Sequence, residues 1–212
     1  ANLGTEHPQV ATGVNNLGSV LQDLGDLTGA KAAYERALKI FEKQLGGDHP
    51  NVATLVNNLG EVLRQQGDLA GAQVAFERAL KIDEATYGPD HPSVARDVNN
   101  LGSVLQNLGD LAGAKAAFER ALKIDEATHG LDHPSVAIRI NNLGMVLQAV
   151  GDFAGAQAAF ERALKIFEKQ LGRDHPNVAV SLWWLGVLAR DEGNKDVARN
   201  YFERALGILK KN

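Results

Sequence analysis

Five regularly spaced histidines are the residues of this chain most suggestive of metal chemistry. His7, His49, His91, His133 and His175 are each followed by proline, and each is 42 residues from the next. Neighbouring helices pack with their axes about 8–10 Å apart, so equivalent histidines on successive helices lie too far apart to share one ion. We therefore expect these histidines to serve the starts of helices, and we predict no metal and no cofactor.

Other catalytic groups are equally scarce in the sequence. The chain has no cysteine, which excludes a thiol nucleophile, a disulfide framework and a cysteine-based zinc site. No glycine-rich segment leads into Lys-Ser or Lys-Thr, as a phosphate-binding loop of the Walker type would require. No nucleophile has a base partner in the pattern. The sequence therefore predicts a protein that is not an enzyme.

Paired asparagines are the second recurring polar feature, and they are positioned to form hydrogen bonds. The pairs are Asn15-Asn16, Asn57-Asn58, Asn99-Asn100 and Asn141-Asn142. Asparagine is only a middling helix former, so eight of them inside predicted helices require a reason. A side-chain amide both donates and accepts, so it can bind the backbone of an extended peptide whatever its sequence. It can equally bond to the amide of the next repeat, and the sequence leaves both alternatives open.

These residues recur because the whole chain is repetitive. Five periods of 42 residues account for nearly all of the 212 residues, and 19 of the 22 glycines fall in register with that period. Such regular spacing of glycines is typical of a solenoid, in which each repeat contacts only its neighbours. We predict a single solenoid domain over 1–212, with repeats at about 7–48, 49–90, 91–132, 133–174 and 175–212.

Each repeat reads as two antiparallel helices, which we call A and B. In 49–90 the apolar residues of helix A are spaced by four, three and four, which gives one helical face: Val52, Val56, Leu59 and Leu63. Pro50 suits the first turn, Gly67 ends helix A, and Asp68 is a good N-cap for helix B. The fold class is therefore all-α with ten helices, broken at Gly25, Gly67, Gly109, Gly151 and Gly193.

A glycine in the middle of every helix A indicates close packing. Gly60 should cost about 1 kcal/mol relative to alanine, and its equivalents recur in all repeats. We expect helix B to approach closely there, with Phe76 buried between small residues.

At this level of detail the sequence resembles a known family. Leu59-Gly60, Leu63, Ala72, Phe76 and Ala79 match the tetratricopeptide repeat pattern, although that repeat usually has 34 residues. The longer period, with His-Pro-x-Val-Ala, Asn-Asn-Leu-Gly and Glu-Arg-Ala-Leu-Lys-Ile, resembles the kinesin-light-chain-like branch over essentially 1–212. The resemblance implies a right-handed α-solenoid of five antiparallel helix pairs, whose A helices line a concave groove. It also implies peptide contacts by Asn15, Asn57, Asn99 and Asn141, and less directly by Asn58 and Asn100.

Comparison of the repeats with one another shows where helix A varies. Thr54 aligns with Arg96 and Ile138, and Glu61 aligns with Ser103 and Met145. The varied positions 54, 61 and 65 form one stripe of the helix, which by the resemblance falls on the groove wall. A constant framework with one varied stripe indicates that the stripe determines which ligand is bound. The alternative is that these residues have drifted neutrally on a solvent-exposed face. The candidate groove residues are the six asparagines that the resemblance names, with Thr54, Glu61, Arg64, Arg96, Ser103, Met145 and Trp183.

The two ends of the chain depart from the pattern. Trp183-Trp184 replaces the asparagine pair in the last repeat, either as a cap on the stack or as an aromatic anchor for a partner. Ala1 to Gly4 is in register with the tail of a B helix, Lys43 to Gly46, so we expect a segment of a longer protein. Apolar surface at an uncapped end would permit self-association.

Composition narrows the class of function. With 44% hydrophobic and 23% charged residues the chain is typical of a folded protein, and a net charge of −4 disfavours nucleic acid as a ligand. No apolar run reaches a membrane span and no signal peptide is evident, so we expect a cytoplasmic protein. The predicted function is a protein-protein interaction scaffold that holds an extended or short helical partner segment in its groove. The alternatives are a sensor or oligomerisation module of a larger signalling protein, and a substrate-positioning accessory domain of an enzyme.

Overall fold

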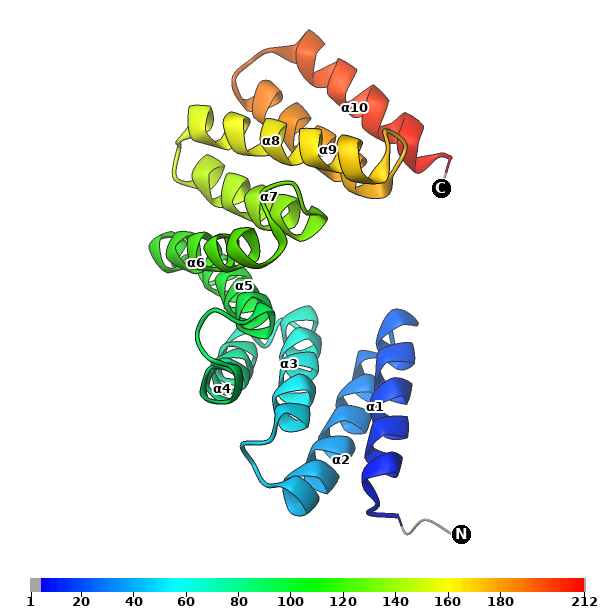
Figure 1. Ribbon diagram of the computed structural model, residues 1–212. Helices are drawn as coiled ribbons and strands as arrows, with labels where there is room; N and C mark the ends of the chain where they lie inside the picture. Colours follow the sequence, from blue (N-terminus) through cyan, green and yellow to red (C-terminus); the bar gives the residue numbers. More distant parts are fainter. Residues whose placement is uncertain (1–4, 212) are drawn as a thin grey trace. The chain divides into compact units, whose positions relative to one another are not determined.

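The computed structural model describes residues 5–211, and there it consists of ten α-helices without a strand (Figure 1). The helices are α1 (Pro8–Asp23), α2 (Leu27–Leu45), α3 (Pro50–Gln65), α4 (Leu69–Tyr87), α5 (Pro92–Asn107), α6 (Leu111–His129), α7 (Pro134–Ala149), α8 (Phe153–Leu171), α9 (Pro176–Asp191) and α10 (Lys195–Leu209). The prediction of an all-helical chain of five A–B pairs is confirmed. The proposed continuation from an earlier repeat concerned Ala1 to Gly4, which lie outside the described residues.

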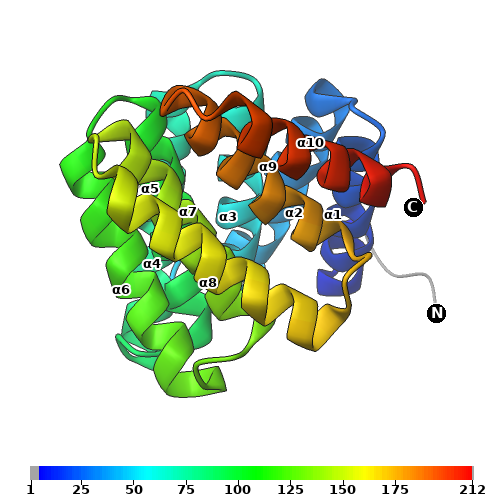
Figure 2. The ribbon, with the colours of Figure 1, turned by 90° about the horizontal axis from the view of Figure 1, so that it is seen from above.

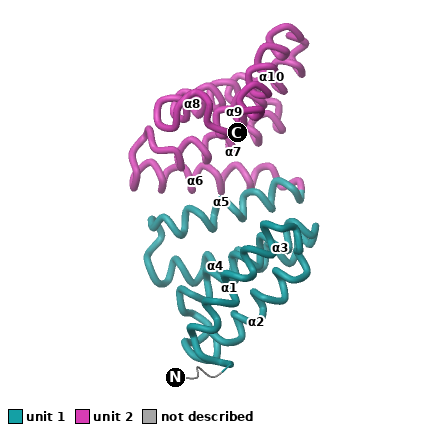
Figure 3. The backbone as a smooth tube through the Cα atoms, turned by 90° about the vertical axis from the view of Figure 1, so that its right-hand side faces the viewer, with its two compact units in different colours: residues 1–108 teal, residues 109–212 magenta. Residues whose placement is uncertain are grey.

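The chain divides into two compact units, 1–108 with α1 to α5 and 109–212 with α6 to α10 (Figure 3). Within each unit every helix packs against the next one along the chain, as two perpendicular views show (Figure 1, Figure 2). The A helices also contact one another, α3 with α5 in the first unit and α7 with α9 in the second. Two A helices of each unit are therefore in direct contact across the repeat boundary.

Every A helix begins at one of the periodic histidines, as expected. Each imidazole is the N-cap residue, and its Nδ1 accepts a hydrogen bond of 3.1–3.2 Å from the backbone N–H two residues later. The proline that follows occupies the first turn, where a missing N–H costs nothing. The histidine-proline pair is thus a helix-start device.

The predicted breaks between helices A and B are also confirmed. The five glycines at these breaks have φ between 81° and 85°, the left-handed region that glycine enters without strain. In the second repeat Asp68 then caps helix α4 by accepting from the Gly71 N–H at 2.9 Å. In the last repeat Asn194 stands in place of the aspartate and makes no side-chain cap bond.

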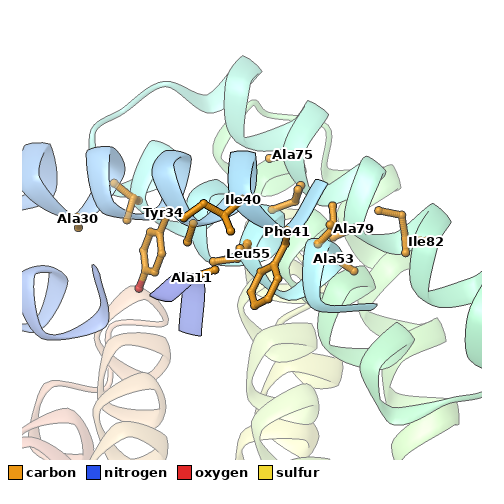
Figure 4. Packing of buried hydrophobic residues seen from close by; sticks show 14 residues of the cluster. Ala11, Ala30, Tyr34, Ile40, Phe41, Ala53, Leu55, Ala75, Ala79 and Ile82 are labelled. Atoms are coloured by element: carbon orange, nitrogen blue, oxygen red, sulfur yellow. The ribbon is translucent and has the colours of Figure 1, made fainter. Parts of the chain in front are cut away.

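The mid-helix glycines accommodate an aromatic ring, as their recurrence predicts. A Cβ added at Gly60 would lie 2.9 Å from the ring of Phe76, which is fully buried. Phe76 belongs to the same buried cluster as Val104 of the next A helix, so this cluster joins two repeats. In the first repeat Tyr34 takes the same place over Gly18, and Figure 4 shows its ring in the core.

Candidate binding surface

The paired asparagines of the first unit form a hydrogen-bonded ladder between repeats. Asn58 Nδ2 donates to Asn15 Oδ1 at 3.1 Å, and Asn100 Nδ2 donates to Asn57 Oδ1 at 2.9 Å. The second asparagine of each pair therefore reaches back to the first asparagine of the repeat before it. This is the second of the two roles that the sequence left open.

In the second unit the ladder ends on a different residue. Asn141 exchanges two hydrogen bonds with the hydroxyl of Ser181, at 2.9 and 3.2 Å. The amide that would otherwise reach back to it is replaced by Trp184, whose ring stacks on Phe160 of the preceding repeat with centroids 6.2 Å apart. A serine one turn earlier thus satisfies the amide that the tryptophan leaves without its usual partner.

The ladder divides the predicted asparagines into two groups. Asn57, Asn99 and Asn141 are at most 7% exposed and lie between helices. Asn15, Asn58 and Asn100 are half-buried, so part of each amide faces solvent. The second group is better placed to meet a ligand, and the resemblance ranked the first group higher.

We expect Asn57→Ala to lower the free energy of unfolding by about 1–3 kcal/mol, because the Asn100 amide would lose its acceptor in a partly buried interface. Chemical denaturation of the purified variants measures this. Asn16→Ala is the matched control, since Asn16 is exposed at the start of the ladder. Equal and negligible losses in both variants would show that the ladder contributes nothing to stability.

None of the stripe residues is fully buried, although Met145 packs against the buried cluster that contains Phe160. Thr54 is exposed, whereas Glu61, Ser103 and Met145 are half-buried on the A helices. Together with the half-buried asparagines, these positions define what we call the A-helix face of each unit.

Two charges of this face neutralise each other. Arg64 donates to both carboxylate oxygens of Glu61, at 2.9 and 2.7 Å, and Gln65 adds a third bond at 2.8 Å. Partial burial raises the pKa of Glu61, but the bonds from Arg64 and Gln65 outweigh it and hold the pKa below its ordinary value. The pair therefore presents hydrogen-bonding groups to a ligand without a net charge.

Arg96, which we predicted from the sequence to contact a ligand, forms ion pairs with two buried carboxylates. Its guanidinium lies 3.2 Å from Asp83 and 2.9 Å from Asp97. Asp97 is fully buried, and its Oδ2 has no hydrogen-bond partner within the described residues. Burial raises the pKa of Asp97 to about 7, although Arg96 opposes this. Loss of Arg96 would therefore leave two carboxylates uncompensated.

The second unit contains a simpler form of the same junction, which the sequence analysis missed. Arg139 Nε donates to Asp125 at 2.9 Å. The sequence does contain a signal for this junction, because Asp83 and Asp125 stand where other repeats have Phe41 and Phe167. An arginine follows each of these aspartates 13 or 14 residues later, on the next helix A.

The A-helix faces of the two units differ in chemistry. In the first unit the stripe carries hydroxyl and charged groups: Thr12, Ser19, Thr54, Glu61, Arg96 and Ser103. In the second unit the positions equivalent to 54 and 61 are apolar (Ile138, Met145, Val180 and Val187), and those equivalent to 65 are Ala149 and Asp191. Ile138 and Val180 are 41% and 47% exposed, so this apolar surface is open to solvent. The A-helix faces of the two units therefore differ in their chemistry.

The two tryptophans of the last repeat have separate environments. Trp184 is half-buried against Phe160, as a cap would be. Trp183 is 52% exposed and lies tilted against Phe202, with centroids 5.0 Å apart. The first ring packs against the preceding repeat, and the second leaves about half of its surface exposed to solvent.

Comparison with known families identifies the repeat. The profile described as tetratricopeptide repeat matches residues 9–85, 53–127, 97–169 and 136–211, which together span nearly the whole chain. Among curated proteins none matches this sequence.

Solved structures with the same fold come from several sources. A putative kinesin light chain from Podosopora anserina with nearly identical TPR-like repeats shares 24% identity at a TM-score of 0.77, over 97% of each chain. BtubC (BKLC) from P. vanneervenii shares 25% identity at a TM-score of 0.80, over 96% of this chain and 81% of that one. A Rap protein complexed with competence and sporulation factor shares 17% identity at a TM-score of 0.80, over 93% of this chain and 53% of that one.

Proposed function

Because this chain belongs to the tetratricopeptide repeat family, we propose that it is a protein-interaction scaffold whose A-helix faces hold an extended or short helical segment of a partner. The observation that carries the proposal is the contrast within helix A. The capping, turn and core positions are nearly constant between repeats, while the stripe positions equivalent to 54 and 61 change from polar in the first unit to apolar in the second.

Further observations support a scaffold over a catalyst. Repeats of this family generally act as non-catalytic scaffolds, and Glu61 on the A-helix face is engaged with Arg64. The Rap structure that resembles this chain in fold was determined with a bound factor. Across residues 5–211, no helix is both long enough and apolar enough to cross a bilayer. A segment of another protein is the ligand that this surface suits best.

The face of the second unit also suggests the chemistry of the ligand. Ile138 and Met145 of α7 and Val187 of α9 offer apolar contact, and the half-buried Asn142 lies between the first two in the sequence of α7. Apolar side chains of the ligand would bury against the first group, while amides and hydroxyls would meet its backbone. We propose that the preferred segment carries at least one large apolar side chain.

Ile138→Glu is expected to weaken, at least tenfold, the binding of peptides selected on the intact chain from a random display library. The new carboxylate would have to be desolvated against the apolar side chain of the ligand. Isothermal titration calorimetry on the selected peptides measures the change. Val74→Glu is the matched control, since Val74 is an exposed valine on the B helix α4. The proposal fails if both variants bind alike, or if no peptide is enriched.

A further inference from the structure

The histidines that begin the A helices can cap them only in the neutral form. Each cap bond is accepted by Nδ1, which lies 3.1–3.2 Å from a backbone N–H and must therefore carry a lone pair. The neutral ring then holds its single proton on Nε2. A second proton would occupy Nδ1, and an imidazolium has no acceptor left. Protonation of the ring and the cap bond therefore exclude each other.

The ring accepts from the first N–H of the helix. In the second repeat Pro50 has no N–H, and the Val52 N–H already bonds to the His49 carbonyl at 2.8 Å. The Asn51 N–H between them bonds to Nδ1 of His49. A protonated ring would leave this N–H without its acceptor, and it would also place a positive charge at the positive end of the helix dipole. Both effects act against the folded start of the helix.

The B helices begin with a different kind of cap. Asp68 accepts from the Gly71 N–H at 2.9 Å, and three further aspartates accept in the same way at the same distance: Asp26, Asp110 and Asp152. Histidine changes its charge between about pH 5 and 8, whereas an aspartate of ordinary pKa remains an acceptor throughout that range. The two kinds of cap therefore separate the A helices from the B helices by their chemistry toward acid.

An exposed carboxylate precedes each of these histidines in the sequence, and it attracts a positive charge. An exposed charge pair contributes little, because water screens it. In three repeats the carboxylate is already bonded to a lysine near the end of helix B: Glu6 to Lys43, Asp132 to Lys169, and Asp174 to Lys211. In the other two repeats the carboxylates are Asp48 and Asp90, and alanine occupies the position of that lysine.

Two caps also have a titratable ring beside them. Tyr87 of α4 stacks on His91 with centroids 4.3 Å apart, and His129 of α6 stacks on His133 at 4.6 Å. Tyrosine is uncharged in the pH range in which histidine titrates, and two imidazolium rings at this distance would repel each other. Neither neighbour offsets the loss of the cap bond.

We propose that the histidine caps make the A helices acid-sensitive: protonation of the rings releases the first turn of each A helix, while the aspartate caps hold the B helices. Loss of one cap lowers the ratio of folded to unfolded chain by about fivefold. Effects at separate repeats multiply, because the caps share no partners. The caps belong to the helices that carry the A-helix faces, but their response to acid requires no ligand.

NMR spectroscopy of the intact, nitrogen-15-labelled chain tests the ring chemistry directly. Long-range spectra that correlate ring protons with ring nitrogens distinguish the Nδ1–H from the Nε2–H tautomer. At about pH 7.5 we expect the Nε2–H tautomer at all five caps. As the pH falls to about 5.5, the bonded backbone N–H signals should shift at the same midpoint as the rings and exchange faster with water. These signals belong to Gln9, Asn51, Ser93, Ser135 and Asn177.

A variant with titration-free caps tests the effect on stability. Asparagine is among the preferred N-cap residues, so the substituted chain should fold at neutral pH. Parent and variant should both carry Asp97→Asn, because Asp97 also titrates in this range. In urea unfolding, the folded-to-unfolded ratio of the parent should fall roughly a hundredfold between about pH 7.5 and 5.5, and that of the variant should change much less. The five substitutions are His7→Asn, His49→Asn, His91→Asn, His133→Asn and His175→Asn.

His129 provides the matched control, since it lies at the end of α6 and is the sixth histidine of the chain. His129→Asn should retain the acid sensitivity of the parent. Three results would overturn the proposal. The first is an equal loss of stability in the five-asparagine variant and the parent. The second is the Nδ1–H tautomer at the caps at about pH 7.5, and the third is titration of the rings that leaves the bonded N–H signals unchanged.

Discussion

Replacing Phe76 by alanine should lower the free energy of unfolding by about 3–5 kcal/mol, the usual cost of deleting a buried aromatic side chain. The ring is fully buried, lies over Gly60, and belongs to a buried cluster that includes Val104 of the next repeat. The cavity would therefore weaken both the pair α3–α4 and its junction with α5. In a solenoid such damage spreads, because each repeat is stabilised by its neighbours.

Phe202 provides the comparison. It lies over Gly186 in the same way but is only half-buried, so Phe202→Ala should cost clearly less. Guanidinium unfolding followed by circular dichroism measures both changes, provided that the slopes of the transitions are compared as well as the midpoints. Equal losses at the two sites would mean that packing between repeats adds little to stability.

The second large effect is expected at Asp97 and depends on pH. Its pKa in the folded protein is about 7, above the ordinary value of 3.8, because burial disfavours the charged form. The folded state therefore binds the proton more tightly than the unfolded state does. The stabilisation from this group is complete below about pH 4 and is lost as the pH rises through about 7.

Asp97→Asn should remove this pH dependence and stabilise the protein at pH 8. The difference between the two pKa values corresponds to up to roughly 4 kcal/mol, at about 1.4 kcal/mol per pH unit. Asp83 and Arg96 face the same carboxyl, so the comparison should be made between variant and parent chain across pH 4 to about 8. If the variant is less stable than the parent at pH 8, Asp97 is ionised there and its pairing with Arg96 prevails.

Much of the fold follows from local signals in the sequence. The His49-Pro50 start, the Gly67-Asp68 turn and the apolar spacing of helix A act within a few residues, so their outcome could be predicted without knowledge of the neighbours. Gly60 is also informative. A glycine in the middle of every helix A lowers helix stability, and its recurrence indicated close packing against Phe76.

The candidate site was less predictable, since its groups pair across repeats. Both asparagines of a pair have the same propensity and the same spacing, and only the packing of α5 on α3 decides that Asn57 is buried while Asn100 is half-exposed. Similarly, Arg96 reads as a free cation until Asp83 of α4 and its neighbour Asp97 are brought beside it. Residues in contact across helices affect each other's contribution to stability strongly. The sequence of one helix does not show which residues of other helices its side chains contact.

The proposal that the A-helix faces hold a partner segment is tested most directly by locating a bound peptide. Hydrogen exchange of the chain, with and without a peptide selected from the display library, should show added protection along α7 and α9 around Met145 and Val187. The even-numbered helices should be unchanged. Protection confined to the even-numbered helices, with α7 and α9 unaffected, would contradict the account.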